Sequence, residues 1–292
     1  MEYFKISDFD IYYCDSSESK LILDFPKNIT YKHLPNKSFS EKILLVLKKI
    51  QTNYVALCAD DDFLSIDTLN KYFYKIKNNE KISLFIGNNL QFNEHFDDQF
   101  FTNKLYEKKD FDLRKSENVK SFLNDYRQVL WGLYSKKNLI MSLEIICKAK
   151  FKNDNFIELV LATISSYFGK IVFVNDIWSV RELSNNSHWA TRHLALYYHH
   201  SDYDIKNDMI IFKNLVDSYT EKGISEIALN QYLPSNFFIK IKYIIKYYLK
   251  IIVSPRIRFF LRRLVKKKNI DYLYIEKSID SSLSLISKIL SK

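Results

Sequence analysis

Short apolar runs alternate with segments of helical periodicity through the first 90 residues, and this alternation limits the possible folds more than any other feature of the chain. The runs are rich in β-branched and aromatic residues, which is typical of buried strands. The predicted strands are residues 9–14, 28–31, 54–58, 82–86 and, later, 173–180, and the predicted early helices are 38–51 and 66–77. This order predicts an α/β fold with a mostly parallel sheet flanked by helices.

Glycine and cysteine are too sparse for several common kinds of site. The four glycines in 292 residues are Gly87, Gly132, Gly169 and Gly223. They lie too far apart for the G-x-G-x-x-G or Walker A loops, so dinucleotide-binding and P-loop classes are excluded. The three cysteines, Cys14, Cys58 and Cys147, are as widely spaced. This spacing predicts reduced thiols instead of a disulfide framework or a zinc site.

The most informative motif is the acidic triplet Asp60, Asp61 and Asp62, which follows the apolar run 54–58. Ligands of open α/β sheets bind beyond the carboxyl ends of the strands. Adjacent carboxylates repel one another unless a cation joins them, and Mg²⁺ or Mn²⁺ commonly bridges carboxylates to substrate phosphates. In an extended segment Asp60 and Asp62 point the same way, so we expect one to hold ribose hydroxyls and Asp62 to hold the metal. The alternative is a solvated turn or a helix N-terminus, where Asp is also common.

Residues 52–64 resemble the D-x-D strand of GT-A glycosyltransferases, and most closely that of a bacterial family, related to the family 2 enzymes, in which this strand ends in D-D-D-F. Residues 11–17 are similar to that family's second strand, which ends in an Asp-Ser-Ser element near the nucleotide base. The resemblance covers about residues 9–195. It implies a nucleotide-sugar donor held by Asp15, Ser16 and the triplet, with Mn²⁺ or Mg²⁺ as cofactor. Only nine residues precede Asp10, so we expect the family's first strand to be missing from this sequence, and the alternative is that another segment takes its role.

Residues 157–171 resemble the family's segment that begins with a pair of acidic residues and ends at a glycine before the next strand. Counting back from Gly169, Glu158 stands at the second acid, which is the catalytic base, and Ile157 replaces the first. Asp154, one helical turn earlier, is the alternative base. A carboxylate within reach of an acceptor hydroxyl can take its proton, while a metal stabilises the departing diphosphate. The alternative is that Glu158 is only the polar face of an amphipathic helix.

Three further side chains are candidates for the same site. Trp131 is predicted to stack on the donor sugar or the acceptor, with a core tryptophan as the alternative. Arg181 begins a polar loop after the strand 173–180 and is predicted to neutralise phosphate. The family resemblance implies that His188, from the same loop, completes the metal or diphosphate site, and a structural histidine is the alternative.

The net charge of +10 is concentrated in one tail. Residues 236–269 contain eleven Lys and Arg and no acidic residue, which leaves the rest of the chain near neutral. Lys242, Lys246 and Lys250 recur every four positions among apolar residues, and this predicts a basic amphipathic helix that lies on an anionic lipid surface through residues 236–268. A helical cap packed on the main domain is the alternative. Nucleic-acid binding is not predicted, because no recognised motif accompanies the charge.

Three segments are predicted from these features. They are a GT-A-like nucleotide-sugar-binding and catalytic domain (1–195), a helical connecting segment (196–235) and the basic tail (236–292). Neither a signal peptide nor an apolar run of roughly 18 residues is visible, which predicts a cytoplasmic protein, peripheral on the inner face of the membrane. The predicted function is metal-dependent, inverting sugar transfer to a surface-polysaccharide or lipid-linked acceptor. The alternatives are a catalytically inert membrane-surface protein on a degenerate transferase core and, less favoured, a nucleotidyltransferase.

Overall fold

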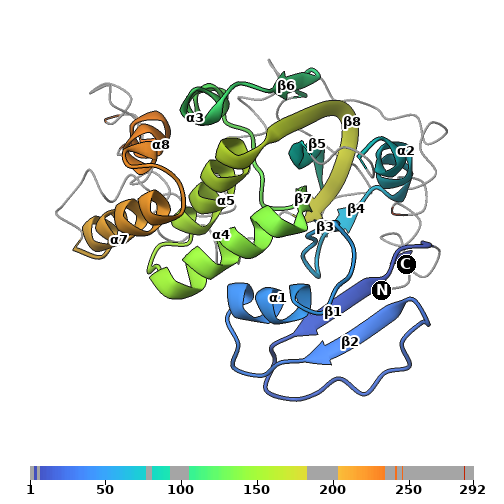
Figure 1. Cartoon of the computed structure of the whole chain (residues 1–292). Helices are drawn as coiled ribbons and strands as arrows, with labels where there is room; N and C mark the ends of the chain where they lie inside the picture. The colour runs from blue at the N-terminus through green and yellow to red at the C-terminus, as the bar shows by residue number, and fades with distance from the viewer. Residues whose placement is uncertain are drawn as a thin grey trace.

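The computed structural model describes residues 3–4, 7–76, 81–92, 105–182 and 203–233, together with residues 241, 245 and 286 (Figure 1). The strands are β1 (Ile11–Asp15), β2 (Ile29–His33), β3 (Tyr54–Ala56), β4 (Phe63–Leu64), β5 (Ile82–Phe92), β6 (Lys109–Phe111), β7 (Leu133–Ser135) and β8 (Lys170–Glu182). The helices are α1 (Phe39–Leu47), α2 (Ile66–Ile76), α3 (Lys115–Asn124), α4 (Lys136–Ala149), α5 (Asn155–Phe168), α7 (Tyr203–Tyr219) and α8 (Ile224–Tyr232).

The described strands form two sheets. β1 and β2 pair with each other alone, and the larger sheet has the order β3-β7-β5-β8-β4, with β6 also on β8. The two long ladders, β1 with β2 and β5 with β8, are parallel, whereas the short ladders of β3, β4, β6 and β7 are antiparallel. The predicted α/β class is therefore confirmed, and the mostly parallel arrangement holds only for the long ladders. Strands of two or three residues show no alternation, which is why β4, β6 and β7 were not predicted.

Helices cover both faces of the larger sheet. Leu84 and Ile86 of β5 pack into a large core with residues of α3, α4, α5, α7 and α8, whereas Phe85 packs into a smaller core with residues of α2. Figure 1 shows α4 and α5 on one side of the sheet and α2 on the other. Because successive side chains of a strand point to opposite faces, this division follows from the strand itself.

Residues 203–233 are the described part of the predicted connecting segment, and they pack into the same large core as Leu84 and Ile86. Phe212 and Val216 of α7 and Leu229 of α8 are buried in one cluster with residues of α3, α4 and α5. Its helical character is as predicted. Of the predicted tail, the structure describes only residues 241, 245 and 286.

The first and last described residues meet in a third apolar cluster. Tyr3 and Ile286 are buried there with Ile66 and Val180. The Tyr3 hydroxyl donates to the Leu64 carbonyl at 2.7 Å and accepts from the Ile66 N–H at 3.3 Å. Tyr3 therefore supports the junction of β4 and α2, directly after the acidic triplet.

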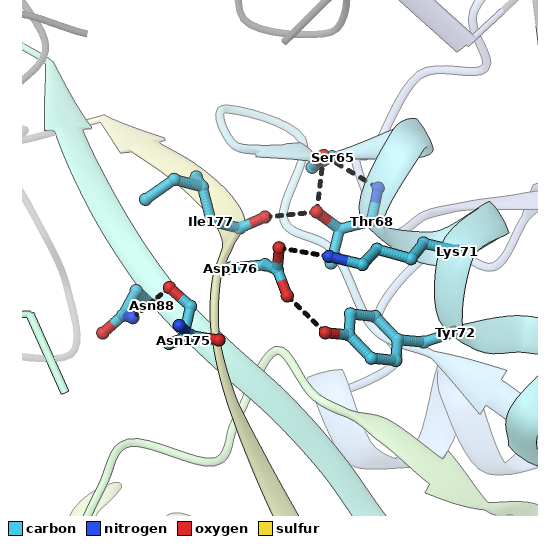
Figure 2. Close-up of polar contacts among 8 residues, drawn as sticks. All are labelled: Ser65, Thr68, Lys71, Tyr72, Asn88, Asn175, Asp176 and Ile177. Carbon is cyan, nitrogen blue, oxygen red and sulfur yellow. Dashed lines mark hydrogen bonds and ion pairs between the residues drawn. The ribbon is translucent and has the colours of Figure 1, made fainter. Parts of the chain in front are cut away.

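Polar contacts at the start of α2 attach this helix to β8 (Figure 2). The Ser65 hydroxyl accepts from the Thr68 N–H at 3.1 Å, as an N-cap residue does, and donates to Thr68 Oγ1 at 3.0 Å. The Thr68 hydroxyl in turn donates to the Ile177 carbonyl at 2.7 Å. Ser65 is fully buried, so its loss leaves polar groups without water to replace it.

β8 is irregular at the same point. A shift in register interrupts its ladder with β5 next to Asn88, whose Nδ2 donates to the Asn175 carbonyl at 2.8 Å (Figure 2). Asp176 accepts hydrogen bonds from Lys71 Nζ and from the Tyr72 hydroxyl. The irregularity therefore faces α2, and the ladder with β5 resumes before the end of β8.

Ser65→Ala is expected to lower the free energy of unfolding by about 1 kcal/mol, within the range of about 0.5–2 kcal/mol for loss of an N-cap. Urea denaturation should show a lower midpoint with an unchanged slope. Ser19→Ala, at an exposed position, is the control. An equal loss of unfolding free energy in the two variants would contradict the role of Ser65 as the cap of α2.

Candidate active site

A cavity of about 1500 Å³ is lined by β1, β3 and the loops that follow them, by α1, by the start of α5 and by the end of β8. It is larger than the roughly 300–1,000 Å³ of common small-molecule sites, so it has room for two substrates. Every predicted site residue that the structure describes lines it: Asp15, Ser16, Asp60, Asp61, Asp62, Trp131, Asp154, Glu158 and Arg181. His188 lies outside the described residues.

The acidic triplet is a turn and not the extended segment that we expected. β3 ends at Ala56, and Asp60 and Asp61 form the turn that leads to β4. Asp60 and Asp61 are exposed, whereas Asp62 is only 6% exposed. The alternation predicted for Asp60 and Asp62 is therefore absent, because side chains two residues apart share a face only in extended backbone.

Asp62 is bonded to the end of β8. β4 pairs antiparallel with β8, with Phe63 opposite Val180, and the same register brings Asp62 opposite Arg181. Its Oδ2 accepts from Arg181 Nε at 3.1 Å, and its Oδ1 accepts from the Glu182 N–H at 3.0 Å. Burial raises the pKa of Asp62, and the nearby Arg181 cation opposes this shift. Both oxygens of the predicted metal ligand thus have protein partners.

Arg181 lies within β8, and not in the loop after it, because the strand continues to Glu182. Its Nη1 donates to Gln128 Oε1 at 2.5 Å, and its guanidinium carbon lies 5.8 Å from the centre of the Trp131 ring. Trp131, which we expected to face a sugar, therefore contacts the arginine. Gln128 was not predicted, because an isolated glutamine in a loop carries no sequence signal.

Glu158 lies in the first turn of α5 and lines the cavity. Its Oε1 accepts from the Val129 N–H at 3.2 Å. Burial raises the pKa of Glu158, and the hydrogen bond from the Val129 N–H acts in the opposite direction. A carboxyl group with a raised pKa is suited to proton transfer near neutral pH. Asp154, the alternative base, occupies the N-cap position of the same helix.

Asp15 and Ser16 lie at the end of β1. Asp15 accepts from the Tyr31 hydroxyl at 2.6 Å and from the Ser17 N–H at 2.9 Å. The Tyr31 bond, followed by the Ser17 bonds, lowers the pKa of Asp15 to about 2. The Ser16 hydroxyl accepts from Lys42 Nζ at 3.3 Å. This end of the cavity therefore holds an ionised carboxylate, and the hydroxyl of the following residue is bonded to a lysine.

The described carboxylates do not form a complete metal site. In the part of the chain that the structure describes, no group of three or more His, Cys, Asp or Glu side chains could hold a metal ion. Both oxygens of Asp62 have protein partners, while Asp60 and Asp61 are exposed. A cation does not fit Asp62 in this arrangement, and the predicted Mn²⁺ or Mg²⁺ stays a prediction.

Comparison with known proteins gives structural neighbours but no family. No family model matches the chain, and no curated protein matches it. A crystal structure of S. aureus TarS 1–349, a glycosyltransferase, has 10% sequence identity and a TM-score of 0.49, and the match covers 87% of this chain and 70% of that chain. A crystal structure of TarS 1–349 in complex with UDP-GlcNAc has 10% identity and a TM-score of 0.39, covering 70% of this chain and 62% of that chain. Membership of the D-D-D-F family stays a prediction.

Tyr31→Phe is expected to raise the pKa of Asp15 from about 2 towards the ordinary value of about 4, because it removes the strongest bond to the ionised form. NMR titration of the carboxyl carbon would measure both midpoints. The lowered pKa also makes Asp15 stabilising above about pH 4, and this contribution is lost as the pH falls through about 2. Tyr13→Phe, which leaves the Tyr31 hydroxyl in place, is the control, and equal midpoints in the two variants would contradict the assignment.

Proposed function

We propose that this chain is a glycosyltransferase that moves a sugar from a nucleotide-sugar donor to a hydroxyl of a glycan or lipid-linked acceptor. The proposal rests on Glu158 and Arg181 lining one cavity, the first with a raised pKa and the second held by Asp62. Sugar transfer needs a base, because a proton leaves the acceptor hydroxyl. It also needs a cation, because negative charge develops on the departing diphosphate.

In the proposed reaction Glu158 accepts the proton of the acceptor hydroxyl as the oxygen attacks the anomeric carbon of the donor. The bond to the acceptor oxygen forms as the bond to the diphosphate oxygen breaks, and the electron pair of the broken bond stays on the nucleoside diphosphate. A single displacement of this kind inverts the anomeric configuration. Arg181 offsets the charge on the leaving group. Asp154 is the alternative base.

The nucleoside is proposed to bind at the end of β1. Asp15 stays ionised at neutral pH because its pKa is about 2, and it can accept hydrogen bonds from a base or a ribose. Ser16 lies next to it, and Asp60 and Asp61 are exposed carboxylates in the same cavity. These groups fit the polar half of a nucleotide-sugar.

We propose that Asp60 and Asp61, the two exposed residues of the triplet, are the ones that bind a metal ion. Asp60 and Asp61 offer the oxygen ligands that Mg²⁺ and Mn²⁺ prefer. A cation there would supply positive charge to the diphosphate. No step above is assigned to it.

The basic tail is proposed to place the enzyme on the inner face of a membrane with anionic lipids. In the regions that the structure describes, no helix is long and apolar enough to cross a membrane. Ile241 and Ile245 are helical and exposed, and their spacing of four residues puts both on one face of a helix. In the sequence each of them directly precedes a lysine of the predicted stripe, Lys242 or Lys246, and an apolar face next to cations is what surface binding requires.

Glu158→Gln is expected to slow sugar transfer by about 10²–10⁴-fold, because the amide cannot take up the acceptor proton. The assay is nucleoside diphosphate release from a panel of UDP- and GDP-sugars with a surface-polysaccharide acceptor. The wild-type rate should fall as the pH drops through the raised pKa of Glu158, since the base must be ionised. Glu226→Gln, on the exposed face of α8, is the control.

Two results of this assay would contradict the proposal. A wild-type chain that neither binds a nucleotide nor releases one from any donor would favour the inert membrane-surface protein. Release of pyrophosphate in place of a nucleoside diphosphate would favour a nucleotidyltransferase.

Replacing Lys242, Lys246 and Lys250 by Gln is expected to weaken binding to phosphatidylglycerol liposomes by about 100-fold, from about 1 kcal/mol for each cation near an anionic surface. Flotation at low and high salt would measure it. Lys206, Lys213 and Lys222, all exposed, are replaced by Gln in a control with the same net charge. Truncation at residue 236 is unsuitable, because Ile286 is a core residue. Equal flotation of the two triple variants would contradict the role of the tail.

A further inference from the structure

We propose that Arg181 and Lys42 together bind the diphosphate of the donor, and that Asp62 is a positioning residue for Arg181 and not a metal ligand. This inference rests on the proposed function and assigns the phosphate-binding part of the same cavity. It adds Lys42, which no sequence motif indicated, and it changes the role of Asp62.

Arg181 is held in place by some of its donors and keeps the others for a ligand. Its Nε bonds to Asp62 and its Nη1 to Gln128, and its guanidinium lies against the ring of Trp131. A guanidinium has five N–H groups, and these two bonds use two of them. The side chain is 24% exposed and lines the cavity, so the remaining donors are accessible from it. A fixed fork of N–H groups matches the oxygens of a phosphate.

Asp62 has the geometry of a support for this arginine. It is buried, and its two oxygens accept from two consecutive residues of β8, the Arg181 side chain and the Glu182 backbone. A buried carboxylate bonded in this way fixes both the strand end and the direction of the guanidinium. A metal at Asp62 would have to displace Arg181 or share its oxygen, and would place two cations side by side.

Lys42 forms no ion pair with the residues that the structure describes. It is half-buried on α1 and lines the cavity, and its side-chain bond is to the neutral hydroxyl of Ser16. Other described lysines are partly buried as well: Lys170 forms ion pairs with Asp110 and Asp112, and Lys136 donates to the Ile50 carbonyl, but neither of these two lines the cavity. A partly buried ammonium with only a hydroxyl for a partner favours binding of an anion, which supplies the missing charge.

Aromatic contacts connect the two cations. Phe39 lies one helical turn before Lys42 on α1 and packs edge-on against Trp131, with ring centres 6.3 Å apart. Trp131 in turn contacts Arg181. Residues three apart on a helix share a face, so Lys42 lies on the same side of α1 as Phe39, and Lys42 and Arg181 both line the cavity. Two phosphates carry more negative charge than one side chain can offset, and two cations around one cavity fit a diphosphate.

The experiment is calorimetric binding of UDP and of inorganic pyrophosphate to the full chain, each in EDTA and in Mn²⁺. We expect both anions to bind in EDTA. Arg181→Gln and Lys42→Met should each weaken binding by 10-fold or more. Lys48→Met, at the exposed C-cap of the same helix and outside the cavity, should leave it unchanged. If Arg181→Gln does not fold, Arg181→Lys tests the same point, because it keeps the charge and loses the fork.

Asp62→Asn tests the positioning role. We expect it to weaken binding in the wild-type background and to have no further effect in the Arg181→Gln background, since it acts through the arginine. Additive effects would overturn the role of Asp62. Binding that disappears in EDTA and returns with Mn²⁺ would overturn the inference while leaving sugar transfer intact. Binding of pyrophosphate without UDP would count against the nucleotide donor but not against the two cations.

Discussion

The pairing of β8 with its neighbours is the constraint on which the site depends. β8 forms the long parallel ladder with β5 and also receives β4 and β6, so its position is set from several directions. Its last two residues, Arg181 and Glu182, bond to Asp62. The acidic turn after β3 is therefore aligned by a strand that comes more than a hundred residues later. A change in the register of β8 would therefore move Arg181 and the turn at Asp60 and Asp61 together.

The strand ends and the helix that carries Glu158 could be predicted because their signals are local. The apolar runs at β1, β3, β5 and β8 are long enough to recognise, and the polar residues that follow β1 and β3 all reach one cavity. Glu158 was placed on a helix, and it lies in the first turn of α5. Ligand sites of α/β folds lie beyond the carboxyl ends of strands, so polar residues directly after β1 and β3 could be predicted as site residues, although the two strands belong to different sheets.

The contacts that decide the chemistry could not be predicted, because they depend on pairing between distant segments. Asp62 and Arg181 are 119 positions apart, and only the antiparallel register of β4 with β8 brings them together. The turn at Asp60 and Asp61 also replaces the extended backbone expected from the apolar run before it. In the sequence, Lys42 cannot be distinguished from an ordinary surface lysine of an amphipathic helix. Only the structure shows that it is bonded to Ser16.

The cluster of Tyr3 and Ile286 links the assembly of the cavity to the synthesis of the basic tail. Tyr3 is synthesised well before Ile286, which follows it by more than 280 positions. Domains fold as they are synthesised, from the N-terminal side onwards. The junction of β4 and α2 therefore lacks its last neighbour until the basic tail has been translated. A nascent chain therefore completes this side of the cavity only after the segment proposed for the lipid surface has been made.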